Sequence, residues 1–266
     1  TVGIAAVHFL QAEQAHISTG QGGRFAQACA PARVGSIILS DVVGDRPDMI
    51  ASGPACPDRS TAAEALEIVQ KYDLKLSERA RSLLSAEPVR ALENAAVRVT
   101  GGVRQLCRSA MDACARRGYR PVLLTDCLGC EAREAGRFLG SIARTHANGG
   151  ERLAFIAGGE TVVHLRGSGR GGRNQELALA LGGEIEGLSN VRAFSLGSDG
   201  TDGPTDAAGG MVDGGSWARL RAQGLSPRTL LDNNDAYTAL SACGGLIVTG
   251  ATGTNVNDVS VVLIDK

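Results

Sequence analysis

Short apolar segments alternate with longer segments of mixed polarity along most of this chain, and few folds accommodate that order. Apolar segments predict strands at 34–39, 97–100, 121–125, 152–157, 191–196, 245–249 and 259–264. Helices are predicted at 61–72, 103–117, 131–146 and 174–181, the first with Ser60 or Thr61 as N-cap and Glu64 near its third position. Because the two kinds of segment alternate, we expect an α/β protein with mostly parallel or mixed sheets.

Three segments suggest how these strands are used. Between residues 97 and 125 a strand, the turn Gly101-Gly102, a helix ended by Gly118 and another strand predict a β-α-β unit. Segments 34–39 and 152–157 predict buried strands, and 161–166 alternates in polarity as a hairpin partner or neighbouring strand would.

Composition and charge exclude several classes of function. The 27 basic and 28 acidic residues give a formal net charge of −1, which leaves no basic excess for nucleic acid. No apolar run approaches the ~20 residues of a membrane span, and residues 1–10 lack the features of a signal peptide. We therefore expect a cytoplasmic protein that binds neither nucleic acid nor membranes. The 36 glycines and 3% aromatic residues suit either a phosphate binder or a small-residue core with many turns.

The seven cysteines are an odd number in a long chain, which argues against a disulfide scaffold. Cys127 and Cys130 form a lone C-x-x-C pair. A structural zinc site requires a second pair of ligands, and a redox role would place this pair at the start of a helix. Incidental thiols are the favoured interpretation.

Polar loops follow several predicted strands, where open α/β sheets bind ligands. Asp41 and Asp45 follow segment 34–39, with Ser52 and Gly53 behind them. This acidic pair could bind Mg²⁺ or accept a hydroxyl proton, or it could form a capped turn. Gly158, Gly159 and Glu160 follow segment 152–157, where backbone N–H groups could face a phosphate or form a tight turn.

The strongest signal for anion binding lies in residues 167–176, where glycines precede two arginines and a predicted helix. A helix N-terminus offers free N–H groups and a positive dipole end. Arg170 and Arg173 add forked donors for phosphate or carboxylate. A flexible surface loop with solvated arginines is the alternative. The pattern is not a Walker A loop, because no Gly-Lys-Ser/Thr follows it.

Two later loops complete the candidate site. Asp199, Asp202 and Asp206 lie among glycines after segment 191–196 and suit Mg²⁺ with phosphate or a nucleotide hydroxyl. In the alternative interpretation, Asp202 or Thr205 caps a following helix. Residues 249–258 form a hydroxyl- and glycine-rich loop that could bind phosphate or simply turn between strands.

Taken together, these loops resemble the glycerate 2-kinase family, the class II glycerate kinases with a C-terminal MOFRL domain. The resemblance rests on GGRFA (22–26), LSDVVGD (39–45), IASGP (50–54), AGGET (157–161), GRGGRNQE (169–176), GSDGTDGPTDAAG (197–209), NNDAY (233–237) and TGATGTNVND (249–258). Two positions depart from the family pattern: Gln21 replaces the usual Lys and Ala251 the usual Pro.

The resemblance implies ATP-dependent phosphorylation of D-glycerate to 2-phosphoglycerate with Mg²⁺. It implies a catalytic role for Asp41, Asp45 and Arg173, with one of the two aspartates orienting or deprotonating the hydroxyl, and metal or nucleotide contacts for Asp199, Asp202 and Asp206. Substrate- or nucleotide-binding residues would be Ser52, Gly53, Gly158, Gly159, Glu160, Arg170, Gly171, Gly172, Asn174, Thr252, Gly253, Thr254 and Asn255.

The resemblance also predicts the domain organisation. Residues 1–95 would be the end of a Rossmann-like N-terminal domain, and 96–266 a C-terminal α/β domain whose MOFRL region spans about 153–264. The family's early Lys and Gly-rich Ser loop would lie upstream of Thr1, so a chain truncated there should have little activity. A homodimer, a non-catalytic ligand-binding fragment and an NAD(P)-dependent hydroxypyruvate reductase remain open; no dinucleotide fingerprint supports the last.

Overall fold

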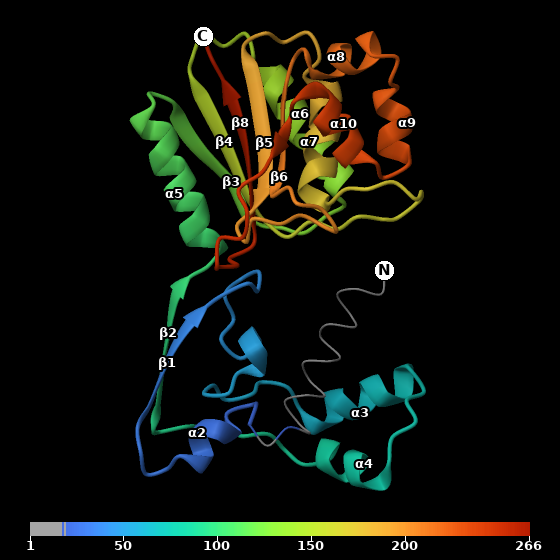
Figure 1. Ribbon diagram of the computed structural model, residues 1–266. Helices are drawn as coiled ribbons and strands as arrows, with labels where there is room; N and C mark the ends of the chain where they lie inside the picture. The colour runs from blue at the N-terminus through green and yellow to red at the C-terminus, as the bar shows by residue number, and fades with distance from the viewer. Residues whose placement is uncertain (1–17, 19) are drawn as a thin grey trace. The chain divides into compact units, whose positions relative to one another are not determined.

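The computed structural model describes residues 18 and 20–266 of the chain (Figure 1). The chain divides into two compact units, unit 1 (Thr1–Thr100) and unit 2 (Gly101–Lys266). The predicted domain boundary at residues 95 and 96 falls at the start of β2 (Ala95–Gly101), the strand that leads from one unit into the other along the sequence. The expectation about residues 1–10 lies outside the described residues. No helix in the described part of the chain is long and apolar enough to span a membrane.

Unit 1 pairs β1 (Val34–Leu39) with β2 and contains the short helical segments α2 (Arg24–Ala28), η1 (Ile50–Ser52), α3 (Ala62–Lys71) and α4 (Glu78–Leu84). The predicted start of α3 is confirmed. The Thr61 hydroxyl accepts the Glu64 N–H at 3.1 Å, and the Glu64 carboxylate accepts the Thr61 N–H at 2.7 Å. This reciprocal capping box satisfies two N–H groups that the helix itself leaves unpaired.

The predicted strand 34–39 is confirmed, but the prediction that it is buried is wrong. Alternate residues are exposed, and Ile37 retains 81% of its accessible surface. Within the described residues β2 is its neighbouring strand in a two-stranded sheet. An apolar strand is buried only when other elements cover it, so its composition alone did not determine its environment.

Unit 2 is built on a six-stranded mixed sheet in the order β3-β4-β8-β5-β6-β7. Strand β3 (Arg120–Leu128) runs parallel to β4 (Leu153–Gly159). Strand β8 (Asp258–Ile264) lies antiparallel between β4 and β5 (Val191–Gly197), and β6 (Gly209–Asp213) and β7 (Leu246–Ile247) continue the sheet antiparallel. The predicted α/β class with mixed sheets is therefore confirmed, and the last residues of β4 and β5 pair with the first residue of β8.

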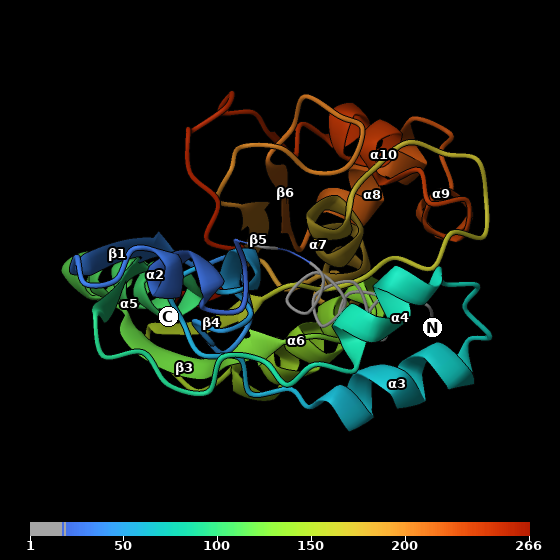
Figure 2. The same cartoon turned by 90° about the horizontal axis from the view of Figure 1, so that it is seen from below.

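Helices cover both faces of this sheet. Ala154 and Ile156 of β4 pack with α5 (Val103–Arg116), whereas Phe155 and Ala157 pack with α6 (Ala132–His146) and α7 (Arg173–Glu184). This alternation follows from the two-residue period of a strand. Helices α8 (Ser216–Ala222), α9 (Pro227–Asp232) and α10 (Ala236–Cys243) gather beside α7 (Figure 2). Helix α7 is thus packed on several sides.

Two predicted pairings are wrong. Strands β2 and β3 belong to different sheets, so residues 97–125 do not form a β-α-β unit; the parallel unit is β3-α6-β4. Residues 161–166 form no strand and make one isolated bridge, between Val162 and Glu131. Instead, the N–H of Arg166 is bonded by the side chain of Asn234, which replaces a strand partner. Strand β6 and helices α8 to α10 were not predicted.

The close packing of α6 on α7 gives a test of this fold. A Cβ added at Gly136 would lie 2.3 Å from the carbonyl oxygen of Leu177. Because backbone must move to accommodate it, Gly136→Ala should lower the free energy of unfolding by about 1–3 kcal/mol, measured by urea denaturation. Gly129→Ala is the control, since its nearest neighbouring atom is 4.0 Å away. Equal stability of the two variants would contradict the helix packing described here.

Candidate functional site

Arg173, the first residue of α7, joins three segments of unit 2. Its Nε donates to Oδ2 of Asp258 at 2.6 Å and its Nη2 to Oδ1 at 3.1 Å. Its Nη1 lies 3.3 Å from Oε1 of Glu160, which directly follows β4. Burial lowers the pKa of Arg173, but the bonds to Asp258 and the charge of Glu160 outweigh this and raise it. The guanidinium is therefore a fixed cation, held in a bidentate fork by the first residue of β8.

Asp202 caps α7 from a distant loop. Its two carboxylate oxygens accept the backbone N–H groups of Asn174 at 3.1 Å and Gln175 at 2.9 Å, and their side-chain amides as well. Asp202 is 3% exposed. Burial raises its pKa, and the four N–H donors oppose that rise. A negative charge here also interacts favourably with the helix dipole.

This capping bears on the predicted roles of Asp202 and Asn174. Asp202 is not available as a metal ligand, because both its oxygens are occupied by protein donors. The N–H groups of Asn174 and Gln175 are not available to a phosphate for the same reason. The alternative prediction, that Asp202 caps a helix, is confirmed, but the helix is α7, which precedes Asp202 in the sequence, and not one that follows it.

Three unpaired backbone N–H groups lie just before these two residues. The backbone N–H groups of Gly171, Gly172 and Arg173 donate to no acceptor within residues 18 and 20–266. All three residues are partly exposed. Three consecutive unpaired N–H groups beside a fixed guanidinium, at the positive end of a helix dipole, suit a phosphate oxygen. The predicted phosphate contact of Gly171 and Gly172 stays a prediction, and the unpaired N–H groups favour it.

Arg170 and Asp206 lie together on the side of Tyr237. The guanidinium of Arg170 stacks 4.1 Å from the centre of the Tyr237 ring, and the Tyr237 hydroxyl donates to Oδ1 of Asp206 at 2.8 Å. That hydrogen bond lowers the pKa of Asp206. Asp199 accepts the N–H of Thr201 at 2.9 Å in a local turn. In the described residues no three acidic, histidine or cysteine side chains are arranged to hold a metal ion, so the three aspartates do not form a ready-made metal cage.

The late loop 249–258 packs on the loop that follows β5. The Thr252 hydroxyl donates to the carbonyl of Ser198 at 2.6 Å, and the Ser198 hydroxyl accepts the N–H of Val256 at 2.8 Å. A Cβ at Gly200 would lie 2.0 Å from the carbonyl oxygen of Gly250, so this contact requires glycine. Thr252 and Asn255 therefore organise the loop by local hydrogen bonds, and Gly253 supplies a positive φ of 76° next to Thr254.

The paired glycines at the end of β4 have a packing role. A Cβ at Gly158 would lie 2.3 Å from Sγ of Cys107 in α5, and one at Gly159 2.2 Å from the carbonyl oxygen of Leu128 in β3. Their small size therefore lets helix and strand approach β4 closely. The predicted contact of these two glycines with phosphate stays a prediction.

In unit 1 the predicted residues lie in a strained segment. Ala51, Ser52 and Gly53 have φ angles of 49°, 55° and 57°, and Asp45 has 51°. The carbonyl groups of Ser52 and Gly53 accept the N–H groups of Gly22 and Gly23 at 2.9 Å and 2.8 Å. Non-glycine residues in this region of φ cost about 1–3 kcal/mol each and cluster at functional sites. Asp41 is exposed, whereas Oδ1 of Asp45 is buried without a hydrogen-bond partner among the described residues.

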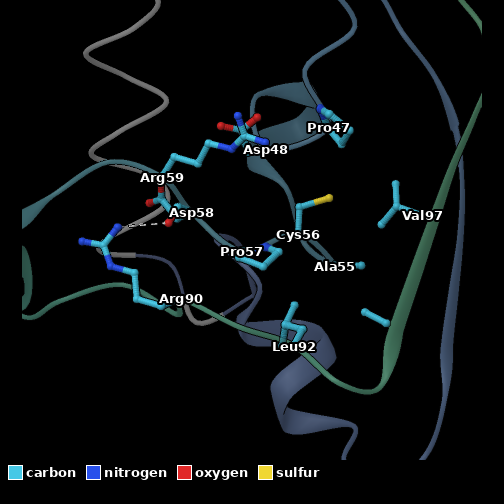
Figure 3. Close-up of a pocket in the computed structure, with 11 residues that line it drawn as sticks. Pro47, Asp48, Ala55, Cys56, Pro57, Asp58, Arg59, Arg90, Leu92 and Val97 are labelled. Atoms are coloured by element: carbon cyan, nitrogen blue, oxygen red, sulfur yellow. Dashed lines mark hydrogen bonds between the residues drawn. The ribbon is translucent and has the colours of Figure 1, made fainter.

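Unit 1 also contains a cleft of about 680 Å³ that none of these predicted residues lines (Figure 3). Ala55, Leu92 and Val97 give it an apolar wall, and charged side chains lie at its rim. Of the charged lining residues, Arg90 donates to the Asp58 main-chain carbonyl at 3.3 Å and forms a salt bridge with Glu87, and Asp48 forms one with Arg46.

Sequence reasoning missed Asp258 and the buried Arg133, which pairs with Glu176 at 2.9 Å. In the sequence, Asp258 is the last residue of the TGATGTNVND motif. A charged residue directly before the apolar strand VSVVLI was a usable signal, because a carboxylate there must find a cation. Arg133 carried no such signal, since nothing in a helical pattern marks one arginine as buried.

The sequence and the fold are both similar to those of known proteins. The sequence model of the MOFRL family matches residues 153–258, and one described as a domain of unknown function, DUF4147, matches residues 7–85. The chain is 46% identical to the D-glycerate 2-kinase of Thermotoga maritima over 98% of its own length and 63% of that protein. A crystal structure of glycerate kinase from Thermotoga maritima superposes with a TM-score of 0.92, covering 97% of this chain and 63% of that one.

A glycerate kinase from Macaca fascicularis is 32% identical over 93% of this chain and 76% of its own. The chain belongs to the glycerate kinase family. Another relative, from Agrobacterium vitis and named "Putative hydroxypyruvate reductase", is 39% identical over 98% of this chain and 70% of its own. The chain spans 63% of the length of the Thermotoga maritima relative.

The capping role of Asp202 can be tested by stability. Asp202→Ala leaves two buried N–H groups unpaired and should lower the free energy of unfolding by about 2 kcal/mol. Asp199→Ala, a control in the same loop, loses one hydrogen bond to Thr201 and should cost about 1 kcal/mol or less. Urea denaturation measures both. If Asp202→Ala were as stable as the unsubstituted protein, Asp202 would not be the cap of α7.

Proposed function

We propose that the protein is a glycerate 2-kinase, which transfers the γ-phosphoryl group of ATP to the 2-hydroxyl of D-glycerate and forms 2-phosphoglycerate and ADP. Membership of the glycerate kinase family supports this class of reaction. The observation that carries the proposal is the fixed guanidinium of Arg173 beside the unpaired N–H groups of Gly171 and Gly172. Phosphoryl transfer depends mainly on positioned positive charge of this kind.

Each part of the α7 start has a separate task in this proposal. Arg173 stabilises the negative charge that develops on the transferred phosphoryl group. The N–H groups of Gly171 and Gly172 bind phosphate oxygens. Asn174 positions rather than binds, because its side chain donates to Asp202 and accepts from the Ser195 hydroxyl at 2.6 Å. Thr252, Gly253, Thr254 and Asn255 would shape the neighbouring loop.

The residues present fit Mg²⁺ bound together with ATP. Mg²⁺ is usually held by one or two carboxylates plus substrate phosphates and water, so a full protein cage is not required. Asp199 is partly exposed, and one of its carboxylate oxygens has no protein partner in the described residues. Asp199 and the exposed Asp206, whose Oδ2 also has no protein partner in the described residues, are therefore better able than Asp202 to supply a ligand. When bound, Mg²⁺ would neutralise charge on the β- and γ-phosphates.

In unit 1 we propose that Asp45 or Asp41 accepts the proton of the glycerate 2-hydroxyl. The buried, unpartnered Oδ1 of Asp45 favours Asp45, since such an oxygen seeks a hydroxyl donor. Ser52 and Gly53 would shape the strained segment beside the substrate, since their backbone N–H groups already donate to the carbonyls of Met49 and Ile50. Location in the cytoplasm and assembly as a homodimer remain predictions.

The reductase alternative requires a dinucleotide site. A Rossmann fingerprint places its glycines in the turn between a strand and the helix that follows at once. Here residues 160–172 separate β4 from α7, and the glycines of 167–172 lie at the far end of that segment. The local geometry therefore favours phosphate binding at α7 over a dinucleotide turn after β4.

The proposal predicts ATP-dependent formation of 2-phosphoglycerate, resolved from 3-phosphoglycerate by phosphorus NMR. Arg173→Ala should lower kcat about 10²–10³-fold, because a charge that acts in the transition state is lost. Arg192→Ala is the control: Arg192 is at the opposite end of β5 and pairs with Asp265. It should leave kcat unchanged.

Three results would count against this function. Formation of 3-phosphoglycerate would overturn the regiochemistry. NADH-dependent reduction of hydroxypyruvate without kinase activity would establish the reductase instead. Binding of ATP or D-glycerate without turnover would make the chain a ligand-binding fragment of the fold.

A further inference from the structure

The segment Arg166–Arg170, which leads into the start of α7, is held along its length by Asn233–Tyr237. Oδ1 of Asn234 accepts the N–H groups of Arg166 at 2.7 Å and Gly167 at 3.1 Å. The next three N–H groups, of Ser168, Gly169 and Arg170, donate to the Asn233 side chain, the Asn233 carbonyl and the Asp235 carboxylate. Every residue of the segment thus has its N–H group bonded by the second segment.

Glycine is required at two places in this contact. A Cβ at Gly167 would lie 2.3 Å from Oδ1 of Asn233, and one at Gly169 would lie 2.4 Å from Cβ of Asp235. The glycines predicted as a phosphate cradle therefore divide into two groups. Gly167 and Gly169 let the two segments approach, and Gly171 and Gly172 present their N–H groups.

Two buried charged residues, Glu176 and behind it Arg133, fix the orientation of the Asn234 side-chain amide. Its Nδ2 donates to Oε2 of Glu176 at 2.9 Å and to the His164 carbonyl at 3.3 Å, and Oε1 of Glu176 accepts Nε of Arg133 at 2.9 Å. Asn234, Glu176 and Arg133 are 5%, 2% and 1% exposed. Only a donor can face a carboxylate and only an acceptor can face two N–H groups. The amide of Asn234 consequently has one possible orientation.

We propose that Asn234 is a positioning residue for phosphate binding: through Arg166 and Gly167 it sets where the N–H groups of Gly171, Gly172 and Arg173 stand. Glu176, with Arg133 behind it, fixes the amide of Asn234 in the orientation that this task needs. The proposal rests on the proposed phosphate site at the start of α7. In this role Asn234 contacts no substrate and acts through the backbone of residues 166 and 167.

The amide of Asn234 and the carboxylate of Glu176 can be exchanged without a change in net charge. Asn234→Asp alone sets a carboxylate against that of Glu176, with loss of the donor and like-charge repulsion. The double variant Asn234→Asp with Glu176→Gln reverses the polarity of the bond. The new amide at position 176 would then donate to the new carboxylate at position 234, and the carbonyl oxygen of that amide would still accept from Arg133. The other oxygen of the new carboxylate would still accept the two N–H groups. Net charge is the same as in the unsubstituted protein.

The test measures the affinity of the protein for tripolyphosphate by titration calorimetry, which requires no turnover. Asn234→Asp should weaken binding about tenfold, since the loss of a buried hydrogen bond displaces the binding groups. The double variant should recover most of that loss, and not all of it, because the His164 carbonyl still lacks its donor. Asn190→Asp is the control. Asn190 lies directly before β5, away from α7, and its side-chain amide donates to the carbonyls of Ala147 and Asp265. This substitution should lower stability while leaving tripolyphosphate affinity unchanged.

Two further readouts separate positioning from general destabilisation. In the turnover assay Asn234→Asp should raise KM for ATP about tenfold with kcat within about twofold of the unsubstituted value. Hydrogen exchange of the N–H groups of 166–170 should accelerate in Asn234→Asp and return in the double variant, with the rest of α7 unchanged.

The outcomes distinguish this inference from the proposed function. Unchanged tripolyphosphate affinity in folded Asn234→Asp would overturn the positioning role, whether or not the protein is a kinase. A loss shared equally by Asn190→Asp, or not recovered in the double variant, would also overturn it. If the unsubstituted protein did not bind tripolyphosphate, the anion site would fail here, while formation of 2-phosphoglycerate would decide the kinase activity separately.

Discussion

The first turn of α7 holds the loops of unit 2 together. Its four residues bond several distant parts of the chain: Arg173 bonds the start of β8, Asn174 and Gln175 both bond Asp202, and Glu176 bonds Arg133 and Asn234. A helix start leaves N–H groups that must find acceptors. Here Asp202, from a distant loop, accepts two of them, and the side chains of Arg173 and Glu176 bond three further segments, so the start of this helix organises the loops around it.

The charged side chains of this turn and of its cap, Arg173, Glu176 and Asp202, all have partners within the protein. Glu176 and Asp202 are almost fully buried, and each is surrounded by donors, as buried carboxylates must be. Arg173 remains partly exposed, with its guanidinium fixed by Asp258. The positive groups left over for a ligand are therefore this guanidinium and the N–H groups before it. Removal of either buried carboxylate should disturb the site through its supports rather than through direct contact.

How far the sequence predicts this structure depends on how local each interaction is. The capping box of α3 links residues three apart and was predicted, as was the buried strand β4, whose neighbours cover both faces. Asp202 reaches α7 across 28 residues, and its loop was predicted to bind metal instead. The apolar pattern of β1 resembles that of β4 but lacks cover in the described residues, and β2 and β3 were paired wrongly because chain order does not determine sheet membership. Motif resemblance found Arg173, but not Asp258, which orients it.

The central claim is that α7 presents two kinds of N–H group, a pair capped by Asp202 and an open set that binds phosphate. A crystal structure of the protein with tripolyphosphate tests it most directly. We predict a phosphate group bonded to the N–H groups of Gly171, Gly172 and Arg173 and to the Arg173 guanidinium, with Asp202 still on Asn174 and Gln175. An anion bonded to Asn174 and Gln175 with Asp202 displaced, or one bound away from α7, would contradict the account.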